Sequence, residues 1–132
     1  MAAVASGKLV AADTSSLQRY LAGAPGDDVA AVSVALEDGS LCLPPIVLAE
    51  ALSDPGLTPS KGRLVRALPL LEIVSGYWER AGLLRGTRRA TGHKAFLPDV
   101  LIAQCCIDNK IPIITYDRDF RHFIAAGLKL VV

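Results

Sequence analysis

Four carboxylates in this chain have the type and the placement that metal chemistry requires: Asp13, Glu50, Asp99 and Asp117. Asp13 directly follows the apolar residues 9–12, Asp117 follows a second apolar run, and Glu50 and Asp99 lie within or at the start of helix-like segments. A charged group beside a buried segment is costly unless something neutralises it, and neighbouring carboxylates raise one another's pKa. A divalent cation would relieve both costs, so the four acids are predicted to form one metal-binding cluster.

The residue types in this cluster indicate which cation and which reaction to expect. Mg²⁺ and Mn²⁺ prefer carboxylate oxygens, whereas zinc sites use nitrogen and sulfur ligands. A cation of this kind lowers the pKa of a coordinated water and offsets the charge that develops on a leaving oxygen. The predicted chemistry is metal-assisted hydrolysis, with Mg²⁺ or Mn²⁺ as the cofactor.

Each acid also has a structural explanation that needs no metal. Asp13 or Asp99 could cap a helix, Glu50 could pair with a core arginine, and Asp117 could form a turn with Asp119. Four separate explanations would not bring the acids to one place. Their shared placement therefore favours the metal site.

A scaffold of short strands alternating with helices is predicted around these acids. Strands are expected at residues 9–12, 41–43, 70–74, 111–115 and 128–132. A first helix is expected to have Ser15 or Ser16 as its N-cap. Further helices are expected at residues 27–38, 45–52, 61–68, 77–90, 98–109 and 117–126. This alternation implies a parallel sheet with right-handed crossovers. The carboxyl ends of its strands share one edge, where Asp13 and Asp117 would meet, with Glu50 and Asp99 approaching from helices.

Length and composition indicate one α/β domain over residues 1–132. A chain of 132 residues suits a single domain. With 52% hydrophobic but only 5% aromatic residues, the interior must be built mostly from aliphatic side chains. This composition is typical of parallel sheets covered by helices.

The three cysteines, Cys42, Cys105 and Cys106, form neither an even disulfide framework nor a zinc-ligand spacing. Cys105 and Cys106 lie in a helical pattern, where at least one is expected to pack in the core. No apolar run approaches the roughly 20 residues of a membrane span, and residues 1–7 lack the regions of a signal peptide. We therefore expect a cytoplasmic protein without membrane contact.

Charge is unevenly distributed along the chain although the formal net charge is only +1. Residues 61–94 carry eight lysines and arginines against Glu72 and Glu79. A basic stretch beside an acidic metal centre would suit a phosphodiester substrate, whose backbone needs cationic contacts. The alternative is a solvated helix face with no ligand.

Four segments together resemble PIN-domain ribonucleases, especially the VapC-type toxins of bacterial toxin–antitoxin pairs. They are residues 9–15, 45–50, 97–103 and 114–120, and the resemblance spans essentially the whole chain. It implies a three-layer α/β/α fold with a five-stranded parallel sheet and endonucleolytic cleavage of RNA. It also implies Mg²⁺ or Mn²⁺ held by Asp13, Glu50, Asp99 and Asp117.

The same resemblance implies partners and supporting residues. Proteins of this kind commonly form homodimers and are silenced by a small protein antitoxin. Thr115 matches a hydroxyl residue near the metal, and Thr14 and Asp119 are candidates for outer support. The connection at residues 88–96 departs from the usual toxin pattern because it is basic and has few acids. Its charged side chains are candidate RNA contacts that could equally face the antitoxin: Arg88, Arg89 and Lys94.

Two histidines and two aromatic residues have weaker functional interpretations. His93 could contact a phosphate or assist proton transfer, but metal-bound water can do the acid–base work. His122 is expected on a helix surface without a role. Tyr77 and Trp78 could stack on an unpaired base, although packing against the core or a dimer partner is favoured.

Three functions compete at this stage. The first is a metal-dependent endoribonuclease acting as a toxin. The second is a catalytically silent RNA-binding or regulatory PIN module, against which the intact acid set argues. The third is a metal-dependent phosphotransfer enzyme in which the Asp117-x-Asp119 pair supplies a nucleophile, ranked last because that pair lies near the end of the chain.

Overall fold

A parallel sheet lies in the middle of the computed structural model, which describes residues 8–131. Within these residues three strands are assigned, β1 (Val10–Ala12), β2 (Leu41–Cys42) and β3 (Ile113–Ile114), in the order β2-β1-β3. Both pairings are parallel. The central strand β1 therefore delivers the residue after it, Asp13, to the middle of the carboxyl edge.

Two outer segments extend this sheet by one parallel bridge each. Leu70 pairs with Leu43 just beyond β2, and Leu130 pairs with β3 on the other side. The predicted parallel α/β sheet is thus confirmed, but the strands expected at residues 70–74 and 128–132 are reduced to single bridges.

The outer segments are short because they have a partner on one side only. Pro69, directly before Leu70, has no N–H to donate to a ladder, and the exposed residues 72–73 leave the sheet. Val132, the end of the last predicted strand, lies outside the described residues. Residues 1–7, for which no signal peptide was expected, lie outside them too.

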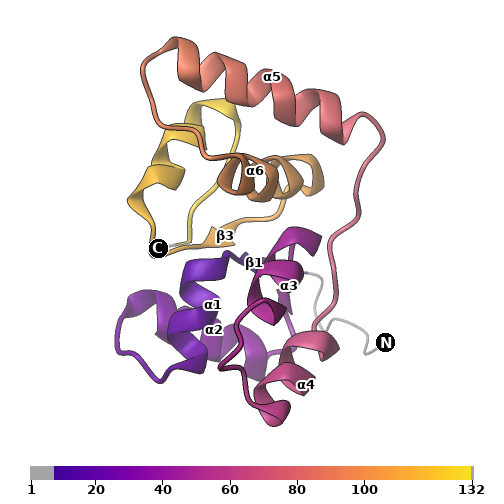
Figure 1. Cartoon of the computed structure of the whole chain (residues 1–132), viewed down its shortest axis with the longest axis vertical. Helices are drawn as coiled ribbons and strands as arrows, with labels where there is room; N and C mark the ends of the chain where they lie inside the picture. Colours follow the sequence, from indigo (N-terminus) through magenta and orange to yellow (C-terminus); the bar gives the residue numbers. More distant parts are fainter. Residues whose placement is uncertain (1–7, 132) are drawn as a thin grey trace.

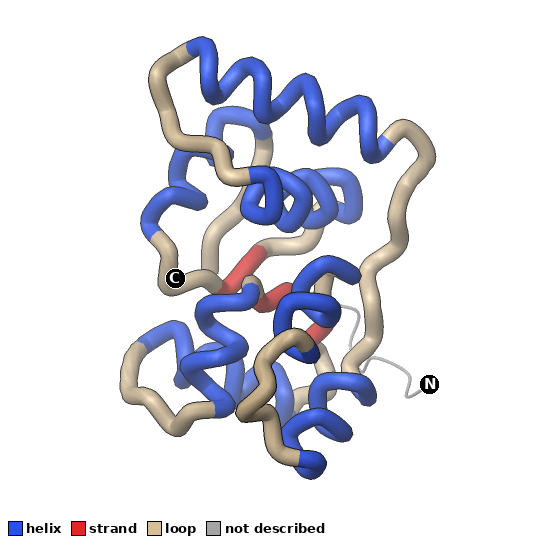
Figure 2. The backbone as a smooth tube through the Cα atoms, viewed as in Figure 1, coloured by secondary structure: helices blue, strands red, loops and turns tan. Residues whose placement is uncertain are grey.

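Helices cover both faces of the sheet (Figure 1). One side carries α1 (Thr14–Leu21), α2 (Asp27–Glu37), α3 (Pro45–Leu52) and α4 (Pro59–Ala67), and the other side carries α5 (Tyr77–Ala90), α6 (Leu97–Asn109) and the 3₁₀ helix η2 (Arg118–Ala126). Figure 2 shows the strands enclosed between these two helical layers. Within residues 8–131, no helix is both long enough and apolar enough to cross a membrane.

Most helices begin and end close to where the sequence predicts. One difference is α4, which starts at Pro59 instead of Lys61, because the Thr58 hydroxyl accepts a bond from the Lys61 N–H and Pro59 suits the first turn. At the end of the chain, the segment predicted as a short helix is a 3₁₀ helix that Gly127 terminates with φ 111°.

The core is aliphatic, with two phenylalanines and the cysteines packed into it. Cys105 and Cys106 are both buried free thiols, which confirms their predicted packing role. Tyr77 is also buried, and its hydroxyl donates to the Leu101 carbonyl at 2.6 Å. Core packing does not extend to Trp78, which is 67% exposed and meets the Tyr77 ring edge to face.

Candidate functional site

Asp13 is a buried carboxylate at the end of the central strand. It is 2% exposed and accepts bonds from the Ser15 hydroxyl, from the Ser16 N–H at 2.9 Å and from the Thr115 hydroxyl at 2.7 Å. The prediction that Ser15 or Ser16 caps α1 is wrong, because Asp13 itself is the N-cap. These donors are neutral, so they orient the carboxylate without cancelling its charge.

Thr115 joins the end of β3 to the end of β1. Besides donating to Asp13, its hydroxyl oxygen accepts from the Asp117 N–H at 3.0 Å. The Asp117 carboxylate in turn accepts from the Asp119 N–H at 2.9 Å and caps η2. The turn foreseen for Asp117 and Asp119 is therefore present, and it fixes a half-buried carboxylate next to the buried one.

Glu50 reaches the same edge from α3. The Thr14 hydroxyl, one residue after Asp13, donates to Glu50 Oε1 at 2.5 Å. The alternative in which Glu50 pairs with a core arginine is not realised, because the ion pairs found within residues 8–131 are Arg19–Asp28 and Arg80–Asp108. Thr14 thus connects the second acid to the first.

Asp99 lies in the first turn of α6, which Pro98 helps to begin. It is half-buried, and burial together with the negative charges of Asp117, Asp13 and Glu50 raises the pKa of its carboxyl to about 6. The other three predicted acids thus lie close enough to Asp99 for their charges to act on its carboxyl.

The donors at this edge fit a hard divalent cation. They are carboxylate and hydroxyl oxygens, the ligand type that Mg²⁺ and Mn²⁺ prefer, and Asp99 carries the raised pKa that a nearby cation would relieve. No three His, Cys, Asp or Glu side chains in residues 8–131 are arranged as a complete ligand set. The predicted four-acid ligand cluster is therefore not assembled in these residues, although Mg²⁺ can be held by one or two carboxylates while it keeps several waters.

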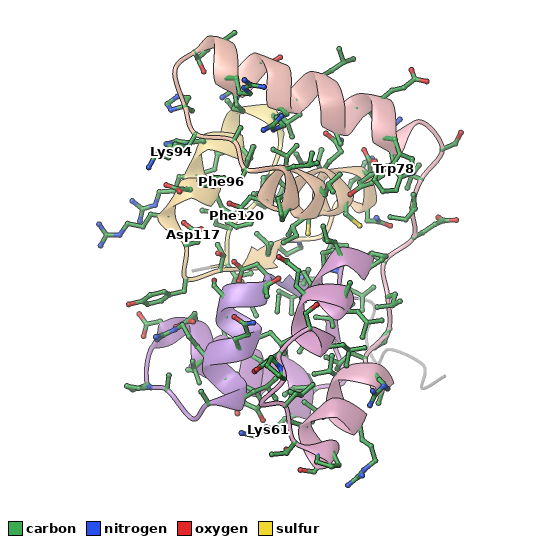
Figure 3. All side chains as sticks on the ribbon, in the orientation of Figure 1. Lys61, Trp78, Lys94, Phe96, Asp117 and Phe120 are labelled. Carbon is green, nitrogen blue, oxygen red and sulfur yellow. The ribbon has the colours of Figure 1, made fainter. Side chains whose placement is uncertain are left out.

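Of the predicted RNA-contacting residues, Arg88 and Arg89 lie in the last turn of α5, and Lys94 lies on the connection from α5 to α6. Arg89 and Lys94 are exposed, whereas Arg88 is half-buried and its Nη1 donates to the His122 carbonyl at 2.9 Å. Through this bond Arg88 joins the end of α5 to η2. Figure 3 shows Lys94 and Asp117 on the same side of the molecule.

His93 and His122 form a contact that the sequence did not indicate. Their rings stack with centroids 4.1 Å apart and 25° between the planes. His122 is half-buried in this stack, so the expectation of a simple helix-surface histidine is corrected.

Sequence reasoning also gave no role to Tyr116, although it lies between Thr115 and Asp117. The Arg19 guanidinium carbon is 3.7 Å from its ring centroid, and Asp28 holds that arginine. An aromatic residue placed between two polar site residues was the available signal.

Known proteins resemble this chain in sequence and in fold. A family model described as PIN domain matches residues 10–125, which include all four acids. A chain in the crystal structure of a member of the VapBC family of toxin-antitoxin systems, VapBC-5, from Mycobacterium tuberculosis, superimposes with a TM-score of 0.61. It is 19% identical, and the match covers 93% of this chain and 98% of that chain. The search of curated proteins found no match.

Proposed function

Because the chain belongs to the PIN-domain family, we propose that it is a metal-dependent endoribonuclease that hydrolyses RNA phosphodiester bonds. One observation carries this proposal: Asp99 is a half-buried acid whose raised pKa comes from burial and from the other acids of the same edge. A half-buried acid beside like charges does not stabilise the fold. Perturbed carboxyl groups of this kind are typical of functional sites.

Asp13, Glu50, Asp99 and Asp117 would hold Mg²⁺ or Mn²⁺. The cation would supply a water of lowered pKa and offset negative charge at the phosphate. The chain's own groups prepare the carboxylates for this role: Thr115 and Ser16 fix the oxygens of Asp13, and Thr14 orients Glu50. Asp99 holds its proton up to a pH of about 6 and gives it up when positive charge arrives.

A cleavage assay with a matched pair of variants tests this proposal. Purified protein is incubated with a mixed RNA pool and Mg²⁺, Mn²⁺ or chelator, alongside Asp99→Asn and Asp38→Asn. Asp38 is an exposed acid at the end of α2, on the amino side of β2, so its variant should cleave like the wild type. Metal-dependent products from the wild type and Asp38→Asn, and none from Asp99→Asn, support the nuclease.

The opposite pattern would also be informative. Equal products from Asp99→Asn would remove Asp99 from the site or reveal a contaminating nuclease. RNA binding without products under any metal would favour the alternative, a catalytically silent RNA-binding or regulatory module.

We further propose that the nuclease is the toxin of a type II toxin–antitoxin pair and forms a homodimer in the cytoplasm. Support comes from the fold it shares with a structure of the VapBC family. A short neighbouring reading frame for a small protein should, when co-expressed, suppress cleavage. Light scattering of the purified chain should give twice its monomer mass, whereas a monomer at all concentrations would contradict the dimer.

A further inference from the structure

Tyr116 presents its ring beside the edge of the sheet where Asp13 and Asp117 lie, here called the acidic edge. The residue is 60% exposed although both of its neighbours belong to the site. Thr115 donates to Asp13, and the Asp117 N–H bonds back to Thr115, so the backbone on each side of the ring is fixed. The ring is therefore held within one residue of a candidate metal ligand.

One face of this ring is occupied by a cation from the chain itself. The Arg19 guanidinium carbon is 3.7 Å from the ring centroid. Arg19 is in turn fixed, because its Nε donates to Asp28 at 2.9 Å and its Nη2 donates to the Pro25 carbonyl at 2.6 Å. Asp28 is 4% exposed, so this support is rigid. A group that stacks on the free face would meet a ring already in place, which lowers the entropic cost of binding.

A cavity of about 360 Å³ opens beside the ring. Tyr116 and Asp117 line it together with the exposed Arg118 and Arg121, and Asp27 and the Arg19-paired Asp28 line it as well. A second hollow is lined by Ser15, Tyr116, Asp117 and Arg118. The two hollows share three residues, and Ser15 bonds to Asp13, so the depression leads to the acids. Aromatic faces accept bases and guanidinium groups accept phosphates.

We propose that Tyr116 stacks on one unpaired base of the RNA substrate while Arg118 and Arg121 contact the phosphates beside it. This inference rests on the nuclease function proposed above and adds to it a base-stacking residue. In an A-form helix both faces of a base are covered by its neighbours. A ring fixed at a protein surface can stack only where the strand is unpaired.

RNA binding to Asp99→Asn, which leaves the strand uncut, tests the inference. The probes are a labelled single-stranded oligoribonucleotide, its duplex, and the same strand with one abasic ribose moved through each position. We expect the duplex to bind about 10-fold more weakly than the single strand. One abasic position should cost a similar factor, as the loss of one base–aromatic stack does.

Substitutions at the ring separate stacking from general charge attraction. In the same background, Tyr116→Phe keeps the ring and should bind as before. Tyr116→Ala should weaken binding about 10-fold and abolish the abasic penalty. Trp78→Ala removes an equally exposed aromatic residue that Figure 3 shows on the opposite side of the molecule from Asp117, and it should change nothing.

The results distinguish this inference from the proposed function. A flat abasic scan, a duplex bound as tightly as the single strand, or unchanged binding by Tyr116→Ala would each overturn the base site. Metal-dependent cleavage by the wild type in the same experiment would leave the nuclease standing. If the wild type neither binds nor cleaves single-stranded RNA, both proposals fail.

Discussion

The two ends of α6 carry aspartates in opposite surroundings. At the first turn, burial and the neighbouring carboxylates raise the pKa of Asp99 to about 6. At the last turn, Asp108 accepts bonds from Arg80 at 2.9 and 2.7 Å and from Gln104 at 2.8 Å. Burial would raise the pKa of Asp108 too, but these bonds and the Arg80 charge hold it below its usual value.

This difference indicates that Asp108 stabilises the fold, whereas Asp99 remains available to a cation. Asp108 receives its cation from the chain, as Asp28 does from Arg19. Asp99 has no such cation within hydrogen-bonding distance in residues 8–131 and faces like charges instead. Under the proposed function, positive charge for that end of the helix comes from a cation in solution, and four measurements test this contrast.

Removing the paired acid should have the largest effect on stability. Asp108→Asn leaves the Arg80 guanidinium without its charged partner, so the free energy of unfolding should fall by about 1–3 kcal/mol. RNA cleavage at a temperature where the variant is folded should not change. Urea titration and the cleavage assay check both parts, and lost activity in a folded variant would mean that Asp108 also acts in the site.

Removing the unpaired acid should do the reverse. Asp99→Asn abolishes cleavage in our proposal, yet it should raise the unfolding free energy by about 1–2 kcal/mol at pH 7. The folded carboxyl has a pKa of about 6 against a usual 3.8, so the wild type loses stability as the pH rises through that window. The gain of the variant should therefore vanish below about pH 4, and a constant gain at all pH values would show that charge is not its cause.

Divalent cations should stabilise the wild type more than they stabilise Asp99→Asn. At ten times its dissociation constant, Mg²⁺ adds about 1.4 kcal/mol to the unfolding free energy of a protein that binds it only when folded. Thermal unfolding with and without Mg²⁺, compared between the wild type and Asp99→Asn, measures this difference. Equal stabilisation of both proteins would place the ion elsewhere.

The smallest expected effect lies on α5, away from both acids. Gly82 is exposed inside this helix, and a Cβ there would meet nothing within 4 Å. Gly82→Ala should therefore stabilise the protein by about 0.5–1 kcal/mol. Cleavage should stay unchanged, which would show that added stability alone does not alter activity. Destabilisation would instead indicate that another molecule or copy packs on this face.

Local signals in the sequence were sufficient for much of the fold. The bounds of α5 were predicted as residues 77–90, because an amphipathic pattern there is followed by a glycine-containing connection from Thr91. The outer strands were not predictable in their extent. Whether the segments around Leu70 and Leu130 continue beyond one bridge depends on partners far along the chain and on neighbouring prolines and glycines.

The candidate site divides in the same way. The positions of the four acids followed from strand ends and helix starts, whereas their hydrogen-bond partners did not. Thr14 and Glu50 are 36 residues apart, and only packing of α1 against α3 brings them together. The N-cap of α1 was predicted as Ser15 or Ser16, although Asp13 was also considered as a possible cap, and an aspartate directly before a helical segment is a preferred N-cap.

The bond between Asp13 and Thr115 spans 102 residues, since the first strand of the chain pairs with one of the last. During translation, Asp13 leaves the ribosome long before Thr115 exists, and synthesis proceeds at roughly 5–20 residues per second. Until β3 arrives, the central strand lacks one neighbour and the acidic edge lacks two of its members, Thr115 and Asp117. A nascent chain that ends before Asp117 therefore cannot hold Asp13, Thr115 and Asp117 together at this edge.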